Sequence, residues 1–319
     1  MKKAIIIIVN WNGKKFLKNC LNSIYKQTYK KFEVYFIDNG SIDKSPEYVR
    51  KNFPTVKIIQ LDRNYGFAKG NNEGIKEAFK DKQVEYIICL NNDTEVDKNW
   101  LKELIKTAEK DEKIGAVGSL SIYPNKKIQT AGIKLLDSKT FNENRSYEMS
   151  LFNGESQKSL KREIEIFAPS GVSALYKKKS LEKVGLFDED FFAYCEDIDL
   201  GYRLRNKGYI SICNPKSKLT HFHSQTGKAS SPFKAFYSKR NSFFVVIKNF
   251  SFIYMLLYPL RDLMWNLTNL YKKDRSESIN KLSSKIGSLG IFAIMLKVYL
   301  SILYYLPKML MKRYSDKKA

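Results

Sequence analysis

The sequence predicts an α/β fold in which a mostly parallel β-sheet is flanked by helices, with an apolar helical region after it. In the first half of the chain, short runs of β-branched residues alternate with helical patterns, which is typical of a parallel sheet with crossover helices. Four of these runs end at Asn or Asp residues, as expected where strand ends line a ligand crevice. The composition becomes strongly apolar and aromatic after about Ser230. We therefore expect one domain over residues 1–230 and a C-terminal amphipathic helical region over residues 231–319.

The expected elements alternate along the chain. Apolar residues at three- and four-residue spacing predict helices, and short runs of consecutive apolar residues predict buried strands. In order, we expect a strand over Ala4–Val9, a helix over Lys14–Tyr25, a strand over Phe32–Ile37, a helix over Ser45–Asn52, a strand over Val56–Leu61, a helix over Gly66–Phe79, and strands over Tyr86–Leu90 and Val172–Tyr176. Residues 120–165 are polar and irregular, which predicts a loop-rich insertion.

The net charge of +23 indicates an anionic partner. The sequence contains no zinc-finger spacing, helix-turn-helix pattern or RNA-binding signature, so we expect no nucleic-acid partner. A basic surface beside apolar helices instead fits an anionic membrane surface. The four cysteines show no CxxC spacing, which predicts buried thiols in a reducing compartment. The apolar run Ile5–Val9 is too short for a secretory signal.

Two apolar segments of the C-terminal region, Phe243–Leu270 and Ile286–Leu310, each carry a narrow polar stripe on a helical wheel. The first stripe contains Asn241, Lys248, Ser251, Asp262, Asn266, Asn269 and Lys273, and the second contains Gly290, Lys297, Ser301, Lys308 and Lys312. Such stripes favour helices that lie in a membrane interface. Two alternatives stay open. Ile286–Leu306 is long enough to span a bilayer, with Lys297 near the midplane at a cost of about 3 kcal/mol. The helices could instead pack on the first domain or form a homodimer.

A group of carboxylates stands among aromatic residues between Gly185 and Leu200. Its acidic residues are Asp188, Glu189, Asp190, Glu196, Asp197 and Asp199, and its aromatic residues include Phe191, Phe192 and Tyr194. Apolar surroundings raise the pKa of a carboxyl group toward values that suit a general base. The alternative interpretation is a solvated loop followed by the acidic start of a helix.

Five motifs follow one another in order. They are Val9-Asn10-Trp11-Asn12, Asp38-Asn39-Gly40-Ser41-Ile42-Asp43, Asn64-Tyr65-Gly66-Phe67-Ala68-Lys69-Gly70-Asn71-Asn72, Leu90-Asn91-Asn92-Asp93-Thr94, and Tyr194-Cys195-Glu196-Asp197-Ile198-Asp199-Leu200 with Arg203. Their order and spacing resemble family 2 glycosyltransferases of the Rossmann-like GT-A fold. Within this family they are most similar to the rhamnosyltransferase-like branch that builds bacterial surface polysaccharides. The resemblance covers roughly residues 1 to 245.

The resemblance implies a divalent cation, Mn²⁺ or Mg²⁺, because the diphosphate of a sugar nucleotide must be neutralised before it leaves. Asn91-Asn92-Asp93 occupies the place of the family's Asp-x-Asp motif, so Asp93 is the one carboxylate there and Asn91 is a second candidate ligand. His221 lies 24 residues after Asp197, where related enzymes carry a metal-binding histidine. His223 is the less favoured ligand. The alternative for His221 is a packed or hydrogen-bonded histidine.

The resemblance also implies which residues bind the nucleotide sugar. The candidates are Asn10, Asn12, Asp38, Arg63, Asn64, Gly66, Lys69, Asn72 and Asn92. Asp38 is expected to recognise the ribose or the base, and Asn10 and Asn12 are expected to border the base. Arg63 and Lys69 are candidate partners of the diphosphate. The turn that contains Asn64, Gly66 and Asn72 is expected to place backbone donors against the donor substrate.

Asp197 is the expected general base, because inversion at the anomeric carbon needs a carboxylate that removes the proton of the acceptor hydroxyl. Glu196 is expected to orient the acceptor. Asp199 and Arg203 stand four residues apart and are expected to form a supporting ion pair. The insertion over residues 120–165 is expected to lie on the acceptor side.

Taken together, these features predict an inverting, metal-dependent glycosyltransferase. It would move a sugar from a UDP- or dTDP-linked donor, such as dTDP-rhamnose, to a lipid-linked or growing cell-surface glycan. We expect it at the cytoplasmic face of the cell membrane as a peripheral or monotopic protein. Two other functions stay open. A sugar nucleotidyltransferase would need a Gly-rich basic loop after the first strand, which residues 10–14 supply poorly. A membrane-bound scaffold would bind glycan or nucleotide without turnover.

Overall fold

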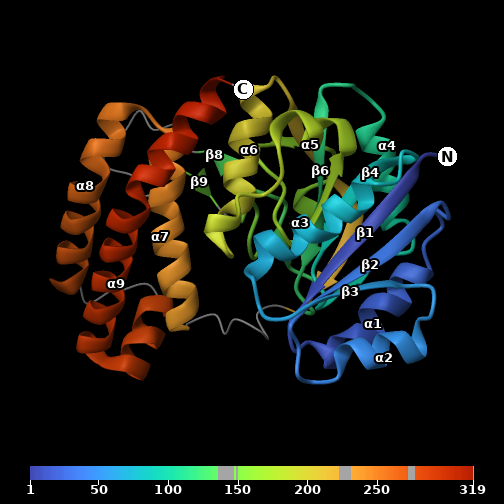
Figure 1. The fold of residues 1–319 in the computed structure, drawn as a ribbon, viewed down its shortest axis with the longest axis horizontal. Helices are drawn as coiled ribbons and strands as arrows, with labels where there is room; N and C mark the ends of the chain where they lie inside the picture. Colours follow the sequence, from blue (N-terminus) through green and yellow to red (C-terminus); the bar gives the residue numbers. More distant parts are fainter. Residues whose placement is uncertain (136–146, 149, 223–230, 272–276, 319) are drawn as a thin grey trace.

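A computed structural model describes residues 1–135, 147–148, 150–222, 231–271 and 277–318. In these ranges a mixed ten-stranded sheet is flanked by helices, and three further helices stand beside it (Figure 1). The strands run in the order β10-β12-β6-β11-β4-β1-β2-β3, with β5 paired to β12 and β7 paired to β6. This arrangement confirms the predicted α/β architecture.

The first half of the chain forms the parallel part of the sheet. Its elements are β1 (Lys3–Asn10), α1 (Lys14–Tyr25), β2 (Phe32–Asn39), α2 (Ser45–Asn52), β3 (Lys57–Leu61), α3 (Gly66–Phe79) and β4 (Val84–Leu90). Ile6 and Ile8 of β1 enter the core beneath α1, whereas Ile5 and Ile7 enter the core beneath α3. Because successive side chains of a strand point to opposite faces, a strand covered on both sides needs an unbroken apolar run. The four consecutive isoleucines of β1 meet that need.

The second half extends the sheet with strands of both directions. Its elements are β5 (Thr94–Val96), α4 (Trp100–Ala108), β6 (Ile114–Ile122), β7 (Ile128–Thr130), β8 (Lys134–Leu135), β9 (Tyr147–Glu148), η1 (Gln157–Ser159), β10 (Ile164–Ile166), β11 (Ser173–Lys177), α5 (Lys178–Val184), η2 (Glu189–Phe191), α6 (Glu196–Asn206) and β12 (Ile210–His221). β11 runs antiparallel to both β4 and β6, and β12 runs parallel to β6. The predicted insertion therefore contains short strands as well as loops.

Three helices form the C-terminal region, α7 (Pro232–Asn249), α8 (Phe252–Tyr271) and α9 (Glu277–Lys318), with a kink in α9 at Gly287. Phe243 and Phe244 of α7 and Ile302 of α9 share one apolar core with Phe191 and Ile198 of the first domain. α7 lies between the sheet domain and the other two helices (Figure 1). The C-terminal region therefore packs directly on the first domain. The division at residue 230 stays a prediction.

Three residues of the first predicted polar stripe do not face water, and for them this corrects the sequence interpretation. The apolar segment Phe243–Leu270 is not one helix, because the chain leaves helical geometry between Asn249 and Phe252. Asn241, Lys248 and Asp262 are buried. Each of these side chains has a polar partner inside the protein, which offsets the cost of burying it. Asn241 bonds to the carbonyl of Phe191, Lys248 pairs with Asp188, and Asp262 pairs with a lysine of α7. The side chains of Asn266 and Asn269, and the whole of Lys273, lie outside the described residues.

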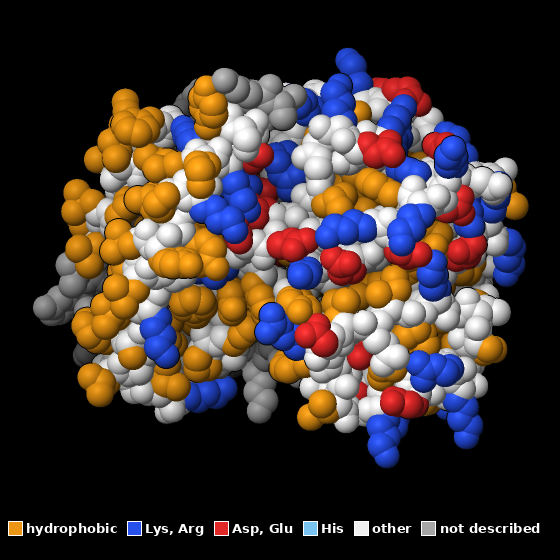
Figure 2. Space-filling model, in the orientation of Figure 1, with side chains coloured by type: hydrophobic (Ala, Val, Ile, Leu, Met, Phe, Trp, Pro, Cys, Tyr) orange, Lys and Arg blue, Asp and Glu red, His pale blue; other side chains and the backbone are white. Residues whose placement is uncertain are grey.

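The opposite faces of α8 and α9 are exposed and apolar. The exposed side chains include Phe252, Ile253, Leu256, Leu260 and Leu263 of α8 and Phe292, Leu296, Leu300, Leu303 and Tyr304 of α9. Hydrophobic side chains gather over these helices at the left of Figure 2. Within the described residues, one helix, Leu289–Asp316, is long and apolar enough to cross a membrane; an 18-residue window of it has a mean hydropathy of 1.9, and 11% of that window is buried.

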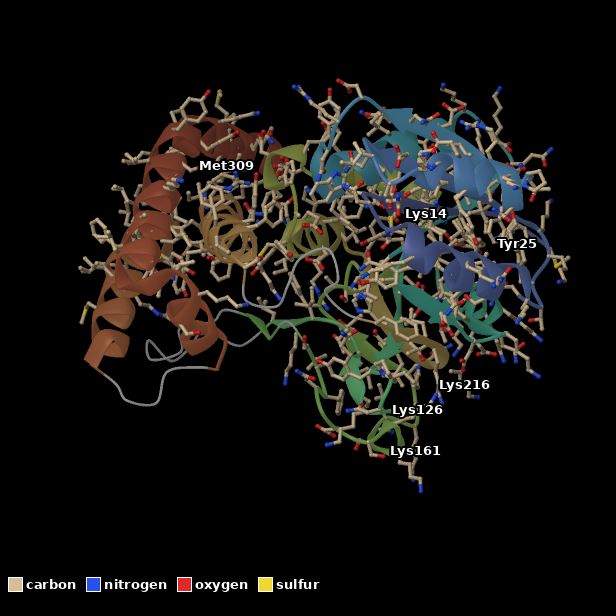
Figure 3. The ribbon with its side chains drawn as sticks, turned by 90° about the horizontal axis from the view of Figure 1, so that it is seen from below. Lys14, Tyr25, Lys126, Lys161, Lys216 and Met309 are labelled. Carbon is tan, nitrogen blue, oxygen red and sulfur yellow. The ribbon has the colours of Figure 1, made fainter. Side chains whose placement is uncertain are left out.

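Part of the positive charge lines a hollow of about 400 Å³ between α4 and the bulge in β12. Lys106, Lys110, Lys161, Arg162 and Lys216 line it together with Glu103 and Glu163. Lys161 and Lys216 lie on the same side of the domain in Figure 3. Lys110 pairs with Glu163 at 2.7 Å. The excess of cations gives this hollow a positive character.

A buried ion cluster joins the two regions of the chain. The ammonium of Lys248 on α7 lies 2.8 Å from a carboxylate oxygen of Asp188 and 2.7 Å from one of Asp199. Asp199 also pairs with Arg203 at 2.9 Å, which confirms the ion pair expected on α6. Lys312 of α9 contacts Asp188 as well. Burial alone would raise the pKa of Asp188, but Lys248 and Lys312 lower it to about 2.

Replacing Lys248 by Met should lower the free energy of unfolding by about 3 to 5 kcal/mol, because two buried aspartates lose their shared cation. Urea unfolding at pH 7 measures the change. Lys297→Met, an exposed lysine of α9, is the matched control and should change stability by no more than about 0.5 kcal/mol. Equal effects of the two substitutions would contradict the ion cluster.

Candidate active site

The carboxyl ends of β1, β2 and β4 meet at one edge of the sheet. Asn10 and Asp38 are register partners at the ends of β1 and β2. Asn10 is fully buried, its Oδ1 accepts a hydrogen bond from Asn92 Nδ2 at 2.7 Å, and its Nδ2 donates to Ser41 Oγ at 3.1 Å. Asn10 and Asn92 therefore brace this edge of the sheet from within, with side-chain groups engaged by the protein.

Asn12 connects the loops that follow β1 and β2. Its backbone N–H donates to Ser41 Oγ at 2.9 Å, and its Oδ1 accepts from the N–H of Ile42 at 2.8 Å. Ser41 therefore bridges Asn10 and Asn12 rather than capping α2. Asp43 does accept from the backbone N–H of Ser45 at the start of α2. These contacts hold the two loops in one shape beside Asp38.

Asp38 has an unused acceptor atom. Its Oδ2 accepts from the backbone N–H of Ser41 at 3.2 Å, whereas its Oδ1 is buried and has no hydrogen-bond partner. A buried carboxylate oxygen without a donor carries a desolvation cost that a bound hydroxyl or N–H would remove. Asp38 is therefore placed to receive a hydrogen bond from a ligand at this edge.

The turn between β3 and α3 is held by its own side chains. Asn64 Oδ1 accepts from the N–H of Gly66 at 2.8 Å and from Asn39 Nδ2 at 3.0 Å. Gly66 has a φ of +86°, and a Cβ there would stand 2.4 Å from the carbonyl oxygen of Phe192. Asn64 and Gly66 therefore shape the N-terminus of α3, as expected for this turn.

The side chain of Asn72 connects α3 to the loop that follows α5. Its Nδ2 donates to the carbonyl of Phe187 at 2.8 Å and to Glu189 Oε1 at 3.1 Å, and its Oδ1 accepts from the N–H of Phe187 at 3.0 Å. Asn72 is 2% exposed. Its side chain therefore holds α3 against residues 187–189, and the binding role expected of this residue stays a prediction.

Arg63 and Lys69 converge on the ring of Tyr65. The guanidinium of Arg63 lies 4.8 Å and the ammonium of Lys69 4.1 Å from the ring centroid. Two cations on one aromatic ring repel each other, and the ring compensates this only in part. The structure therefore brings together two positive groups at the start of α3, a position that suits an anionic ligand.

Asp93, His221 and Gln129 form a buried row. His221 Nδ1 lies 2.7 Å from Gln129 Oε1, and His221 Nε2 lies 3.0 Å from Asp93 Oδ1. Gln129 Oε1 also accepts from Ser121 Oγ at 2.8 Å. An amide oxygen only accepts, so the imidazole carries its proton on Nδ1.

The Nε2 atom of His221 faces a carboxylate oxygen, and this contact is favourable when a proton or a cation lies between the two atoms. Gln129 fixes the ring orientation in the way that outer partners of ligating histidines do. No group of three or more His, Cys, Asp or Glu side chains gathers at one point in the described residues. The pair fits a divalent cation that takes its other ligands from water and substrate phosphates. Asn91 is half-buried beside it, and His223 lies outside the described residues.

Glu196 and Asp197 are buried carboxyl groups, and neither forms an ion pair with a cation in the part of the chain that the structure describes. Burial raises the pKa of Asp197 to about 6, although the N–H groups of Gly171 and Ile198 donate to its two oxygens. Burial and the neighbouring Asp197 raise the pKa of Glu196 well above its usual range. Glu196 Oε2 has no hydrogen-bond partner. A carboxyl group with a pKa near 6 is suited to general-base chemistry at neutral pH.

The loop before Asp197 has an unusual backbone. Phe192, Tyr194 and Cys195 have φ values of +63°, +72° and +67°. Each such conformation costs a non-glycine residue on the order of 1–3 kcal/mol and persists where the surroundings impose it. The residues that impose it are Arg240 and Asn241 of α7, which donate hydrogen bonds to the carbonyls of residues 190–194.

Sequence reasoning missed Gln129, Arg240 and Asn241. Gln129 contacts a histidine 92 positions away in sequence, and Asn241 contacts a carbonyl 50 positions away. Neither residue belongs to a motif. The one available signal was the position of Arg240 and Asn241 just before an apolar run, where polar residues need internal partners.

Known proteins are similar to this chain in sequence and in fold. The family model described as glycosyl transferase family 2 matches residues 5–185. The chain is 27% identical over 244 residues to the O-antigen biosynthesis protein RfbC of Myxococcus xanthus. This match covers 71% of this chain and 18% of that protein. The chain is 24% identical over 233 residues to an N-acetylglucosaminyl-diphospho-decaprenol L-rhamnosyltransferase of Mycobacterium tuberculosis, covering 68% of this chain and 75% of that protein.

The fold is similar to that in a crystal structure of GalNAc-T7 with UDP, GalNAc and Mn²⁺. The TM-score is 0.62 at 18% identity, and the match covers 89% of this chain and 54% of that one. This likeness confirms the expected fold class. The family match confirms the resemblance that the five motifs indicated.

Replacing Asp197 by Asn should change the free energy of unfolding by about 3 kcal/mol more favourably at pH 8 than at pH 3, because a pKa raised from 3.8 to about 6 penalises the charged carboxylate in the folded state, whereas the loss of one acceptor for a backbone N–H is the same at both pH values. The penalty is complete above pH 6 and disappears as the pH falls below 4, so this contribution should vanish there. Urea unfolding at both pH values measures it.

Asp199→Asn is the matched control for this substitution. Burial would raise the pKa of Asp199, but Lys248 and Arg203 hold it below its usual value. This substitution should therefore destabilise the protein at pH 8. An effect of Asp197→Asn that is equal at pH 8 and pH 3 would contradict the buried, unpaired state of Asp197.

Proposed function

The chain belongs to glycosyl transferase family 2, and we propose that it is an inverting glycosyltransferase that moves a sugar from a nucleotide donor to a glycan of the cell envelope. The observation that carries the proposal is the buried Asp197, whose pKa near 6 suits a general base, at the end of a domain that carries the family's motifs. The catalytic domain would comprise residues 1–230.

The donor would bind across the ends of β1, β2 and β4. The unpaired Oδ1 of Asp38 would accept from the ribose or the base, and Asn10, Asn12 and Asn92 would maintain the loops that border the base. Arg63 and Lys69 would contact the diphosphate at the N-terminus of α3. A UDP- or dTDP-linked sugar is proposed, with dTDP-rhamnose favoured by the similarity to a rhamnosyltransferase.

A divalent cation, Mn²⁺ or Mg²⁺, would be held by Asp93 and His221, with Asn91 beside them. When bound, such a cation neutralises charge on the departing diphosphate. The support from this chain is the 3.0 Å contact between Asp93 Oδ1 and a histidine nitrogen whose other ring nitrogen is already paired with Gln129. One carboxylate and one imidazole make a lean site, so phosphate oxygens would complete it.

In the transfer step, Asp197 would take the proton of the acceptor hydroxyl. The hydroxyl oxygen then forms a bond to the anomeric carbon, and the bond from that carbon to the phosphate oxygen breaks. The electron pair of that bond leaves with the nucleoside diphosphate. Attack from the face opposite the leaving group inverts the anomeric centre. Glu196 lies beside Asp197 and would orient the acceptor.

The acceptor would be lipid-linked and reached at the cytoplasmic face of the membrane. The relative from M. tuberculosis is named for a diphospho-decaprenol acceptor. The exposed apolar faces of α8 and α9 and the net charge of +23 support docking on an anionic membrane surface. A homodimer through these helices is the alternative use of the same face. The region 231–319 would thus be membrane-associated.

The proposed function predicts that sugar transfer depends on both Asp197 and a divalent cation. Asp197→Asn should lower the turnover number about 10²- to 10⁴-fold, because the acceptor proton has no base. Asp197→Asn should retain binding of the donor with Mn²⁺, measured by thermal shift against UDP-, dTDP- and GDP-sugars.

Asp93→Asn should instead remove the Mn²⁺-dependent part of that thermal shift. Full transfer by Asp197→Asn would refute its role as base.

Membrane docking predicts that the exposed face of α9 is required for binding to anionic vesicles. The double variant Leu300→Glu/Leu303→Glu should bind vesicles of phosphatidylcholine and phosphatidylglycerol at least about tenfold more weakly in flotation, since two leucines lose their apolar contact. Ile42→Glu, at an exposed position of the first domain, is the control. A wild-type protein that forms dimers and does not float would contradict membrane docking.

A further inference from the structure

The loop between η2 and α6 accepts several hydrogen bonds from the helix α7. Asn241 of α7 donates from Nδ2 to the carbonyl oxygens of Phe191, Ala193 and Tyr194 at 2.7, 2.8 and 2.7 Å. The amide group has two hydrogens, so at least one of them is shared between two carbonyls. Asn241 is fully buried. One side chain therefore orients three peptide planes of a loop with positive φ values.

Arg240 fixes the side chain of Asn241 and donates further hydrogen bonds to the same part of the chain. Its Nε donates to Asn241 Oδ1 at 2.9 Å, so the amide cannot turn over without losing a bond. Its NH2 group donates to the carbonyls of Asp190 at 2.6 Å and Phe191 at 3.1 Å. The guanidinium also lies 4.7 Å from the ring centroids of Tyr237 and Phe244. Arg240 is thus itself held in place by packing.

The held loop leads directly into the residues of the candidate base. Cys195, in the left-handed conformation, is the residue before the first turn of α6, and its carbonyl accepts from the N–H of Asp199 at 3.1 Å. Asp197 stands in that first turn, and its Oδ2 accepts from the N–H of Gly171 at 3.0 Å. The direction in which α6 begins therefore sets where the Asp197 carboxylate lies.

The loop also touches the donor side of the site. The carbonyl of Phe192 accepts from the N–H of Ala68 in the first turn of α3 at 3.1 Å. The ring of Phe192 stacks on Tyr237 of α7, with centroids 4.9 Å apart. α7, the loop and the N-terminus of α3 thus form one continuous set of contacts that passes beside Asp197.

We propose that Asn241 is a positioning residue for the transfer reaction: by binding the carbonyls of residues 191, 193 and 194 it holds the loop in its left-handed conformation and so aims Asp197 at the acceptor. This inference rests on the proposed function. It makes α7 part of the active-site structure, in addition to any contact of the C-terminal helices with lipid. The rival explanation is that Asn241 serves global stability alone.

Alkylation of the four cysteines distinguishes the two explanations without an activity assay. Cys195 lies in the held loop, whereas Cys20, Cys89 and Cys213 lie in the cores of the sheet domain and report global opening. Full-length wild-type protein, Asn241→Ala and the control Ser242→Ala are treated with iodoacetamide, and the rate at each cysteine is read by peptide mass. Ser242 bonds within the C-terminal helices, to the carbonyl of Lys239 and to Tyr258.

In Asn241→Ala, the alkylation rate of Cys195 should rise at least about tenfold, because the loop opens. The alkylation rates of the other three cysteines should stay the same, because the rest of the domain stays closed. Ser242→Ala should match the wild type. An unchanged rate at Cys195, or an equal rise at all four cysteines, would overturn the proposal. Asn241→Ser retains one hydroxyl donor and should give an intermediate rate at Cys195, so it supplies the same test if the alanine variant does not fold.

A double-mutant cycle on turnover then links the loop to the base. Asn241→Ala should lower the turnover number about tenfold or more, and Asn241→Ala/Asp197→Asn should be no slower than Asp197→Asn alone, because one substitution acts through the other residue. Additive losses would mean that Asn241 acts elsewhere. If the wild type transfers no sugar but Cys195 alone is exposed by Asn241→Ala, the proposed function fails while the hold on the loop stands.

Discussion

The common direction of β1, β2 and β4 is the constraint on which the site depends. Parallel strands end on the same side of a sheet, so residues more than 50 positions apart in sequence meet there without any further device. Asn10 and Asn92 form a hydrogen bond with each other at this edge. Asp38 ends the neighbouring strand, and its Oδ1 has no hydrogen-bond partner. The same geometry thus produces both a rigid frame and an unsatisfied acceptor within it.

Between Asp188 and Asp199 the chain places carboxylates in opposite electrostatic states. Asp188 and Asp199 share the ammonium of Lys248, which holds them ionised despite burial. Glu196 and Asp197, next to them in sequence, have burial without a cation, so their pKa values rise. The difference arises because successive side chains of a helix are turned by about 100°, so Asp197 and Asp199 of α6 point to nearly opposite sides. Asp199 meets the ammonium of Lys248 on α7, whereas Asp197 meets the backbone N–H of Gly171.

The sequence predicted the features whose signals are local. The isoleucine run of β1, the asparagines after the strands and the acidic start of α6 are visible in short windows. The contacts of Gln129 and Asn241 were not predictable, because each depends on which distant atom the tertiary fold brings to it. The polar stripe on α7 misled for a related reason. Periodicity shows that polar residues share a face, but the partners that this face meets decide whether it is wet or buried.

The position of α7 in the chain has a consequence for synthesis on the ribosome. The parallel half of the sheet and the acidic segment 188–199 emerge first, and α7 follows them at roughly 5–20 residues per second. Until α7 docks, Asp188 and Asp199 lack Lys248 and the loop before Asp197 lacks Asn241. A nascent chain can therefore fold the parallel part of its sheet while residues 190–195 still lack the contacts of α7. The order of translation itself would delay completion of this loop until the C-terminal helices have joined the domain.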